Sequence, residues 1–329
     1  MSVVRGGIDV GGTKMQAAVV DTRGSVLGAA RRPTPGTAPA VEVIADLDGV
    51  MRDALAEAGL ELSALQGVGV GWPGPANEKA GTVERAVHVA GLKDGYPLTD
   101  SLAASLGVPA YVGNDVQVAT NAEFKHGAGQ PYRSILGVFW GTGVGGGIVL
   151  DGKPWTGRGS AAEIGHVVVR EDGRRCPCGR RGCMEAYAGR AAMEARARRE
   201  AGRGKRTMLV EIMEDRGRDR MTSGVWERAL QKGDPLATRL MDRAVRALGT
   251  GVGSALNVLD VEAVVIGGGL GVRLGPMYLE RITAEVMTHA FSPLPVDVRI
   301  AELGDLGGAI GASLLTKPAS QRRKPAAAN

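Results

Sequence analysis

A cluster of sulfur ligands places the strongest constraint on how this chain can fold. All three cysteines lie within eight residues, at Cys176, Cys178 and Cys183, and His166 precedes the first of them by ten residues. Three thiolates and one imidazole make a complete tetrahedral ligand set for Zn²⁺. One disulfide with a spare thiol, or three reduced thiols, is the alternative, but a Cys-Pro-Cys disulfide would close a small, strained ring, and an odd number of cysteines without a secretory signal argues against an oxidised framework. We therefore predict a structural zinc site, whose four protein ligands leave no position open for Lewis-acid chemistry.

The composition is that of a globular enzyme. The 329 residues are 44% hydrophobic and 23% charged, enough for one large or two ordinary domains. No run of 18 apolar residues and no signal peptide is present, so we expect a cytoplasmic protein with no membrane contact. The net charge of +5 comes with acidic residues interspersed among the basic ones and with only 4% aromatic residues, so we expect no nucleic-acid partner.

One pattern occurs twice along the chain. Residues 6–20 are predicted to form a strand, a glycine-rich turn and a returning strand, and residues 134–150 repeat this order roughly 130 residues later, about one domain's length. Further strands are expected near 68–70, 109–112, 263–266 and 296–300, and helices near 184–199, 235–257, 277–289 and from 306 onward. Strands that alternate with helices indicate an α/β fold with mostly parallel connections. Two related halves that face each other would form a cleft, with a glycine turn from each half entering it.

Three glycine-rich turns are candidates for binding phosphate, because bare backbone N–H groups bind phosphate oxygens. None has the spacing of a P-loop or of the dinucleotide-binding fingerprint, and each taken alone could be an ordinary hairpin turn. Together they favour a nucleoside triphosphate, and Asp9, just before the first turn, could hold Mg²⁺ through water. The turns consist of Gly11, Gly12, Thr13 and Lys14; of Gly141, Thr142 and Gly143; and of Gly267, Gly268 and Gly269.

Phosphoryl transfer also needs a base for the attacking hydroxyl, and Asp115 is the candidate. It follows an expected strand, at the strand end where active-site residues of open α/β sheets tend to lie, although it could instead be only the N-cap of the next helix. A polyhydroxyl substrate requires several fixed carboxylate, amide and imidazole groups, because each hydroxyl both donates and accepts. Asn114, Asp115, Glu163, His166 and Glu185 supply such groups.

These motifs, in this order, resemble the ROK family (repressors, open reading frames, kinases) of the actin-like, ribonuclease H-like superfamily, from Ile8 to about Leu315. The resemblance rests on residues 9–14, 72–75, 114–115, 141–147 and 163–166, and on the Cys-x-Cys-Gly-x-x-Gly-Cys-x-Glu run that ends at Glu185. It implies a two-lobed sugar kinase fold with a central interlobe cleft. The small lobe would comprise residues 1–115 and a returning C-terminal helix at about 305–318. The large lobe would comprise residues 116–304, with the zinc knot at 166–183. Residues 319–329 are expected to form a disordered tail.

The resemblance also implies an activity, ATP-dependent and Mg²⁺-dependent phosphorylation of a hexose at its 6-hydroxyl. Asp115 would be the catalytic base, and the sugar would be bound by Gly74, Asn114, Asp115, Glu163, His166 and Glu185. Glucose, as in glycolysis, is the expected acceptor; fructose, mannose, allose, N-acetylglucosamine and N-acetylmannosamine remain alternatives, as does polyphosphate as donor. The family's sugar-sensing repressors carry a helix-turn-helix domain, for which there is no room before Asp9. Homodimers are usual in the family.

Two positions depart from the family pattern. Ala162 stands where a glycine is usual before the Glu-Ile-Gly-His run, and we expect it to tighten the loop and to shift Glu163 slightly. Trp72 replaces a smaller residue in the Gly-Trp-Pro-Gly loop, and we expect it to shape the sugar pocket.

Overall fold

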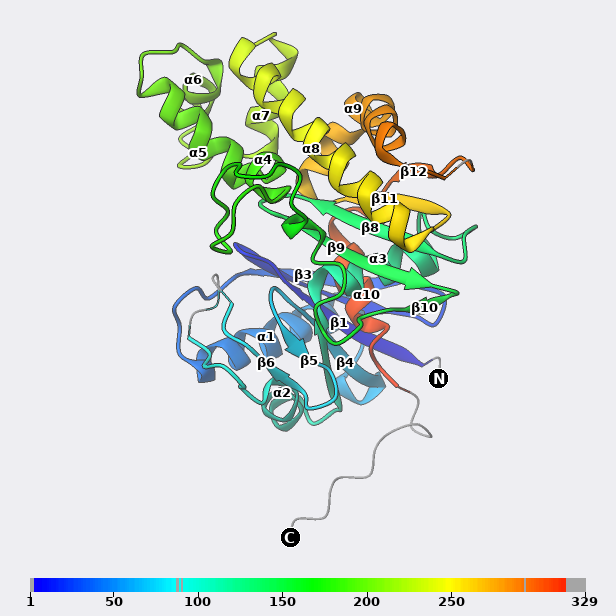
Figure 1. Cartoon of the computed structure of the whole chain (residues 1–329). Helices are drawn as coiled ribbons and strands as arrows, with labels where there is room; N and C mark the ends of the chain where they lie inside the picture. Colours follow the sequence, from blue (N-terminus) through cyan, green and yellow to red (C-terminus); the bar gives the residue numbers. More distant parts are fainter. Residues whose placement is uncertain (1–2, 87–88, 90, 293, 318–329) are drawn as a thin grey trace. The chain divides into compact units, whose positions relative to one another are not determined.

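The computed structural model describes residues 3–86, 89, 91–292 and 294–317 (Figure 1). The tail 319–329, expected to be disordered, lies outside the described residues. The chain divides into two compact units. The first contains residues up to 130, together with 156–160 and the chain from 302 onward, and the second contains 131–155 and 161–301.

The first unit is built on a five-stranded sheet of order β3-β2-β1-β4-β7. Its strands are β1 (Val4–Val10), β2 (Lys14–Val20), β3 (Val26–Pro33), β4 (Leu65–Trp72) and β7 (Ala110–Asn114). Strands β1, β4 and β7 run parallel, whereas β2 and β3 continue the sheet as an antiparallel meander. The remaining elements are α1 (Ala40–Ala58), η1 (Leu62–Ala64), β5 (Ala76–Asn77), β6 (Thr82–Val83), α2 (Leu98–Leu106), α3 (Asp115–His126), η3 (Gly304–Leu306) and α10 (Gly307–Ser313).

Helices α1 and α10 cover opposite faces of this sheet. A Cβ on Gly6 would lie 2.5 Å from the sulfur of Met51 in α1, whereas one on the next residue, Gly7, would lie 1.9 Å from the carbonyl oxygen of Ala309 in α10. Successive strand residues point to opposite faces, which explains the difference. A Cβ on Gly69 of β4 would likewise meet the Ala312 carbonyl at 1.8 Å. The small-residue helix α10 therefore packs with its backbone directly on the strands.

Helix α3 also belongs to the first unit, where it packs against α10. The predicted boundary between the lobes is residue 115, where α3 begins. The first unit extends to Gln130 because α3 packs on the returning helix.

The second unit repeats the sheet topology of the first. Its order is β10-β9-β8-β11-β12, with β8, β11 and β12 parallel and β9 and β10 antiparallel, so the sequence prediction of two related halves is confirmed at the level of topology. The strands are β8 (Ile135–Trp140), β9 (Val144–Leu150), β10 (Lys153–Pro154), β11 (Ala263–Gly267) and β12 (Asp297–Ile300). The other elements are η2 (Ile164–His166), α4 (Glu185–Ala188), α5 (Arg190–Ala201), α6 (Met208–Asp215), α7 (Ser223–Gln231), α8 (Pro235–Leu259) and α9 (Gly268–His289).

The helices of this unit correct two expectations. The helix expected at 184–199 is divided into α4 and α5 at Gly189, which has extended backbone dihedrals. Helix α9 begins at Gly268, well before residue 277, and includes Pro276. Its N-terminal half is glycine-rich, which hid it from the periodicity, but α9 packs against α8 and against the strands of the second sheet. Within the described ranges, no helix is both long and apolar enough to cross a membrane.

Candidate active site

Two acidic residues lie at the same edge of the first sheet. The parallel register pairs Asp9 with Gly71, and Trp72 with Asn114, so the ends of β1, β4 and β7 meet there. A Cβ on Gly71 would lie 3.6 Å from Oδ1 of Asp9 and 3.4 Å from Cα of Asp115. The carboxyl ends of parallel strands are where open α/β sheets bind ligands. The sequence-predicted Asp9, Asn114 and Asp115 are therefore neighbours.

Asn114, and not Asp115, is the N-cap of α3. The Asn114 side-chain oxygen accepts hydrogen bonds from the backbone N–H groups of Val116 at 3.1 Å and Gln117 at 3.0 Å. Asp115 is the first helical residue, and its Oδ1 accepts from the Val116 N–H at 2.9 Å and from Nδ2 of Asn114 at 3.1 Å. The capping role proposed as the alternative for Asp115 is thus filled by its neighbour.

Asp9 lies in an unusual electrostatic setting. Burial raises the pKa of its carboxyl to about 6, although the nearby Lys14 opposes this shift. Lys14 Nζ bonds Oδ2 of Asp305 at 2.9 Å, and the Asp305 charge raises the pKa of Asp9 further. The first glycine turn is closed by a hydrogen bond from the Gly11 N–H to the Lys14 carbonyl at 3.0 Å. Sequence reasoning missed Asp305, because nothing local marks a residue 291 positions away from its partner.

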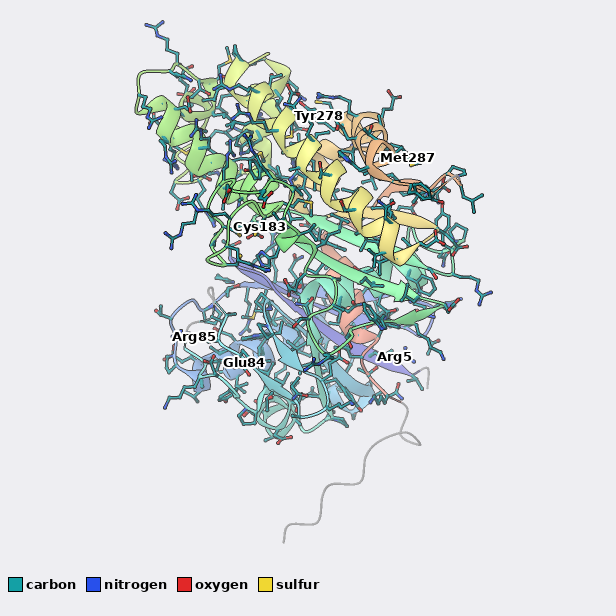
Figure 2. The ribbon with its side chains drawn as sticks, viewed as in Figure 1. Arg5, Glu84, Arg85, Cys183, Tyr278 and Met287 are labelled. Atoms are coloured by element: carbon teal, nitrogen blue, oxygen red, sulfur yellow. The ribbon has the colours of Figure 1, made fainter. Side chains whose placement is uncertain are left out.

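The loop 73–75 approaches Asn114, since Nδ2 of Asn114 lies 3.5 Å from the Gly74 carbonyl oxygen. The Trp72 side chain is fully buried in the core of the first unit, and its effect on a sugar pocket stays a prediction. Its indole Nε1 donates to the backbone carbonyl of Glu84 at 3.0 Å (Glu84 is labelled in Figure 2). Trp72 therefore supports the loop from within the core.

The cysteine and histidine side chains of the second unit come together as the sequence predicts. The ligand atoms of His166, Cys176, Cys178 and Cys183 all lie within 4.8 Å of one another. Sγ of Cys178 and Sγ of Cys183 are 3.7 Å apart, and Nδ1 of His166 is 3.7 Å from Sγ of Cys176 (Cys183 is labelled in Figure 2). A tetrahedron with Zn–S bonds of about 2.3 Å separates its sulfurs by about 3.8 Å, whereas a disulfide requires about 2.05 Å. The donor set and its spacing fit zinc.

The two ring nitrogens of His166 face different partners. Nδ1 points to the sulfur cluster, and Nε2 lies 3.9 Å from Oε2 of Glu163, beyond hydrogen-bonding distance. The Glu163 side chain is 62% exposed. A metal-bound Nδ1 would fix the tautomer with a proton on Nε2, which could then donate to a ligand. This arrangement allows His166 to serve metal and substrate together.

The backbone just before Glu163 adopts a conformation that favours glycine. Ala162 has φ = +64°, in the left-handed region, which costs an L-residue with a Cβ roughly 1 kcal/mol or more. The family-typical glycine would adopt this conformation without strain. Because Ala162 replaces this glycine, the backbone is strained directly before Glu163, a candidate sugar-binding carboxylate.

Glu185 is fixed to the second glycine turn. Its Oε2 accepts a hydrogen bond from the Val144 N–H at 2.9 Å, and a Cβ on Gly143 would lie 2.2 Å from the same oxygen. A side chain at position 143 would force this carboxylate to move. One oxygen of Glu185 thus holds the turn that begins β9.

The second and third glycine turns lie at the same edge of the second sheet. Strands β8 and β11 are parallel, with Gly267 paired to Phe139, and a Cβ on Gly141 would lie 3.7 Å from the backbone N of Gly269. Gly268 has φ = +78°, and no side chain caps the N-terminus of α9. Uncapped N–H groups at a helix N-terminus bind anions. The third turn therefore leads directly into α9, whereas the sequence predicted no helix start there.

Similarity to known proteins extends over almost the whole chain. The chain matches the ROK family over residues 5–319. The glucokinase of Streptomyces coelicolor is 33% identical over 319 residues, which cover 94% of this chain and 96% of that protein. The N-acetyl-D-glucosamine kinase of Salmonella gallinarum is 31% identical over 322 residues, covering 94% and 98% of the two chains.

The solved structures include a ROK family glucokinase from Streptomyces griseus in complex with glucose and AMPPNP. It is 30% identical, has a TM-score of 0.81, and the match covers 95% of this chain and 99% of that one. The duplicated sheet and the glycine turns define a phosphotransferase of the actin-like, two-lobed class, as the sequence predicted. Because the match spans nearly the whole chain, the protein belongs to the ROK family.

Proposed function

We propose that this protein transfers the γ-phosphoryl group of ATP to the 6-hydroxyl of a hexose, with glucose as the preferred acceptor. The observation that carries the proposal is the likeness, along almost the entire chain, to a glucokinase in complex with glucose and AMPPNP. The relatives that act on N-acetylated amino sugars make those sugars the second candidate acceptors.

We assign the role of general base to Asp115. Support comes from its position at the start of α3, beside Asp9 and Asn114, at the carboxyl edge of three parallel strands. Asp115 would take the proton from the sugar 6-hydroxyl while that oxygen bonds to the γ-phosphorus and the bond between this phosphorus and the bridging oxygen breaks, which releases ADP. Gly74, Asn114, Glu163, His166 and Glu185 are proposed to bind the sugar hydroxyls.

The donor nucleotide is assigned to the three glycine turns, and Asp9 is proposed to hold Mg²⁺ through water. A bound Mg²⁺ would supply neutralisation of the phosphate charge. His166 and the three cysteines would hold a zinc ion that fixes the fold around Glu163 and Glu185 and takes no part in the chemistry.

A coupled assay of ADP release tests this proposal. Glucose, mannose, fructose, allose, N-acetylglucosamine and N-acetylmannosamine are each supplied with ATP or with inorganic polyphosphate. We expect turnover with ATP that is fastest on glucose. Absence of turnover on every sugar with both donors would overturn the proposed activity, and a preference for N-acetylglucosamine would favour the second candidate acceptor.

A further inference from the structure

Arg190 links the second glycine turn to the helix that follows it. Its side chain is only 14% exposed and makes three contacts. Nη2 donates to the hydroxyl oxygen of Thr142 at 2.9 Å, and Nη1 donates to the carbonyl oxygen of Met221 at 3.2 Å. Nη1 also lies 3.7 Å from Oε2 of Glu194. A guanidinium with these partners has a fixed plane, so the bond to Thr142 is directional.

Glu194 stands one helical turn after Arg190 on α5 and holds it in place. This largely buried carboxylate accepts from the Met221 N–H at 3.0 Å through Oε2. Its Oε1 accepts from Nε and Nη2 of Arg198, at 2.9 and 2.7 Å. Because Glu194 is itself held by two neighbours, it cannot follow Arg190 if the guanidinium moves, and it therefore orients Arg190.

The backbone of the turn is held by the same helix. The N–H groups of Arg190 and Ala191 donate to the carbonyl oxygens of Gly141 and Thr142, each at 3.0 Å. The turn would thus keep its course without the Arg190 side chain. What the side chain adds is control of the Thr142 hydroxyl, which is exposed at the edge of the sheet where Gly141 approaches the N-terminus of α9.

A hydroxyl whose oxygen accepts from an arginine directs its own proton elsewhere, toward an acceptor. The positive guanidinium also polarises the O–H bond and strengthens it as a donor. The uncapped N–H groups of α9 beside the turn favour an anionic acceptor. We propose that Arg190, oriented by Glu194, is a positioning residue that sets the Thr142 hydroxyl as a hydrogen-bond donor to a phosphate oxygen of the nucleotide. This inference rests on the proposed function, because it takes the nucleotide to be the ligand of the turn.

The test combines steady-state kinetics with direct binding of Mg²⁺–AMPPNP, measured by calorimetry. Thr142→Val removes the hydroxyl and Arg190→Met removes its partner, and each should weaken AMPPNP binding and raise the KM for ATP about 10-fold, as expected for a lost hydrogen bond to a charged group. The KM for glucose should change less than about 2-fold. Thr142→Ser, which keeps a hydroxyl, should restore binding.

The double variant separates positioning from a purely structural contact. If Arg190 acts through Thr142, Arg190→Met in a Thr142→Val background should weaken AMPPNP binding by no more than about 2-fold further, because residues that act as a unit are not additive. The matched control is Arg281→Met, which removes another arginine of the second unit together with its 2.8 Å hydrogen bond to Asp242, and should leave both measurements unchanged.

Each contrary result has a distinct meaning. Additive losses in the double variant, or an Arg190→Met protein with lowered thermal stability and unchanged AMPPNP affinity, would overturn the positioning role. An equal rise in the KM for glucose would do the same. A wild-type protein that binds AMPPNP but phosphorylates no sugar would refute the proposed function, while the binding measurements on the variants would still decide the role of Arg190. A wild-type protein that does not bind AMPPNP would end both.

Discussion

Glu123 should be among the most costly residues in the first unit to replace, because its carboxylate satisfies three backbone donors, two of them from a distant part of the chain. Oε2 accepts from the N–H groups of Ala128 at 3.0 Å and Glu302 at 3.1 Å, and Oε1 accepts from Leu303 at 2.9 Å. The residue is only 2% exposed. Hydrogen bonds to a charged group contribute about 1.5–3 kcal/mol each, and the N–H groups left behind in Glu123→Ala lose their acceptor. Allowing for water that enters the space, we expect a loss of about 4 kcal/mol in the free energy of unfolding.

The measurement is urea unfolding followed by circular dichroism. Glu123→Gln should lie between wild type and Glu123→Ala, because its single oxygen can keep the two donors that share Oε2, while its amide then faces the Leu303 N–H. Lys125→Ala, at an exposed position of the same helix, is the control and should change stability by less than about 0.5 kcal/mol. A loss below about 1 kcal/mol in Glu123→Ala would refute the reasoning that these three bonds stabilise the first unit, two of them by holding residues 302–303 to α3.

Four further outcomes are expected. Asp115→Asn should lower kcat by about 10²–10⁴-fold with glucose binding retained, measured by coupled assay and calorimetry, and unchanged turnover would remove the general base. Wild-type protein should contain about one zinc ion per chain by elemental analysis, and Cys178→Ser should lose most of it and have a lower thermal midpoint. Active wild-type protein without zinc would contradict the assignment of the cysteines and His166 as zinc ligands. Ala162→Gly should raise the free energy of unfolding by up to about 1 kcal/mol as the positive φ is relieved, and a net loss in urea would show that the residue is not strained. Burial raises the pKa of Asp9 from 3.8 to about 6, so between these pH values the folded state retains a proton that the unfolded state releases. The free energy of unfolding of wild type, relative to that of Asp9→Asn, should therefore fall as the pH rises from about 4 to 6. An equal difference between the two proteins at both pH values, measured by urea unfolding, would contradict this.

The sequence predicts the features of this protein that leave a local pattern. The repeated strand, glycine turn and strand is visible in the letters, and both sheets have the same order. The metal ligands are equally visible, because their spacing and chemistry allow few readings. The start of α9 was not predicted, since its glycines lower helix propensity and the helix is stabilised there by packing against β11, β12 and α7, which no local pattern shows.

The groups that support the candidate site could not be predicted, for a different reason. Asp305 bonds to Lys14, and Arg190 to Thr142, across 291 and 48 positions, and no periodicity connects such pairs. Asn114 illustrates a finer limit. A sequence with two adjacent capping residues does not say which one caps, and the outcome decides whether Asp115 is consumed as a cap or stands in the first turn of the helix.

The seating of α10 on bare strand backbone has a consequence for the order of assembly. Strands β1 and β4 leave the ribosome long before the helix that covers them, and the whole second unit is synthesised in between. Until residues 307–313 emerge, the parts of β1 and β4 that α10 covers have no helix on that face, and their glycines offer no side chains to shield them. We therefore expect nascent chains that stop before residue 302 to contain a finished second unit and an unfinished first one, a state in which chaperones would meet this protein.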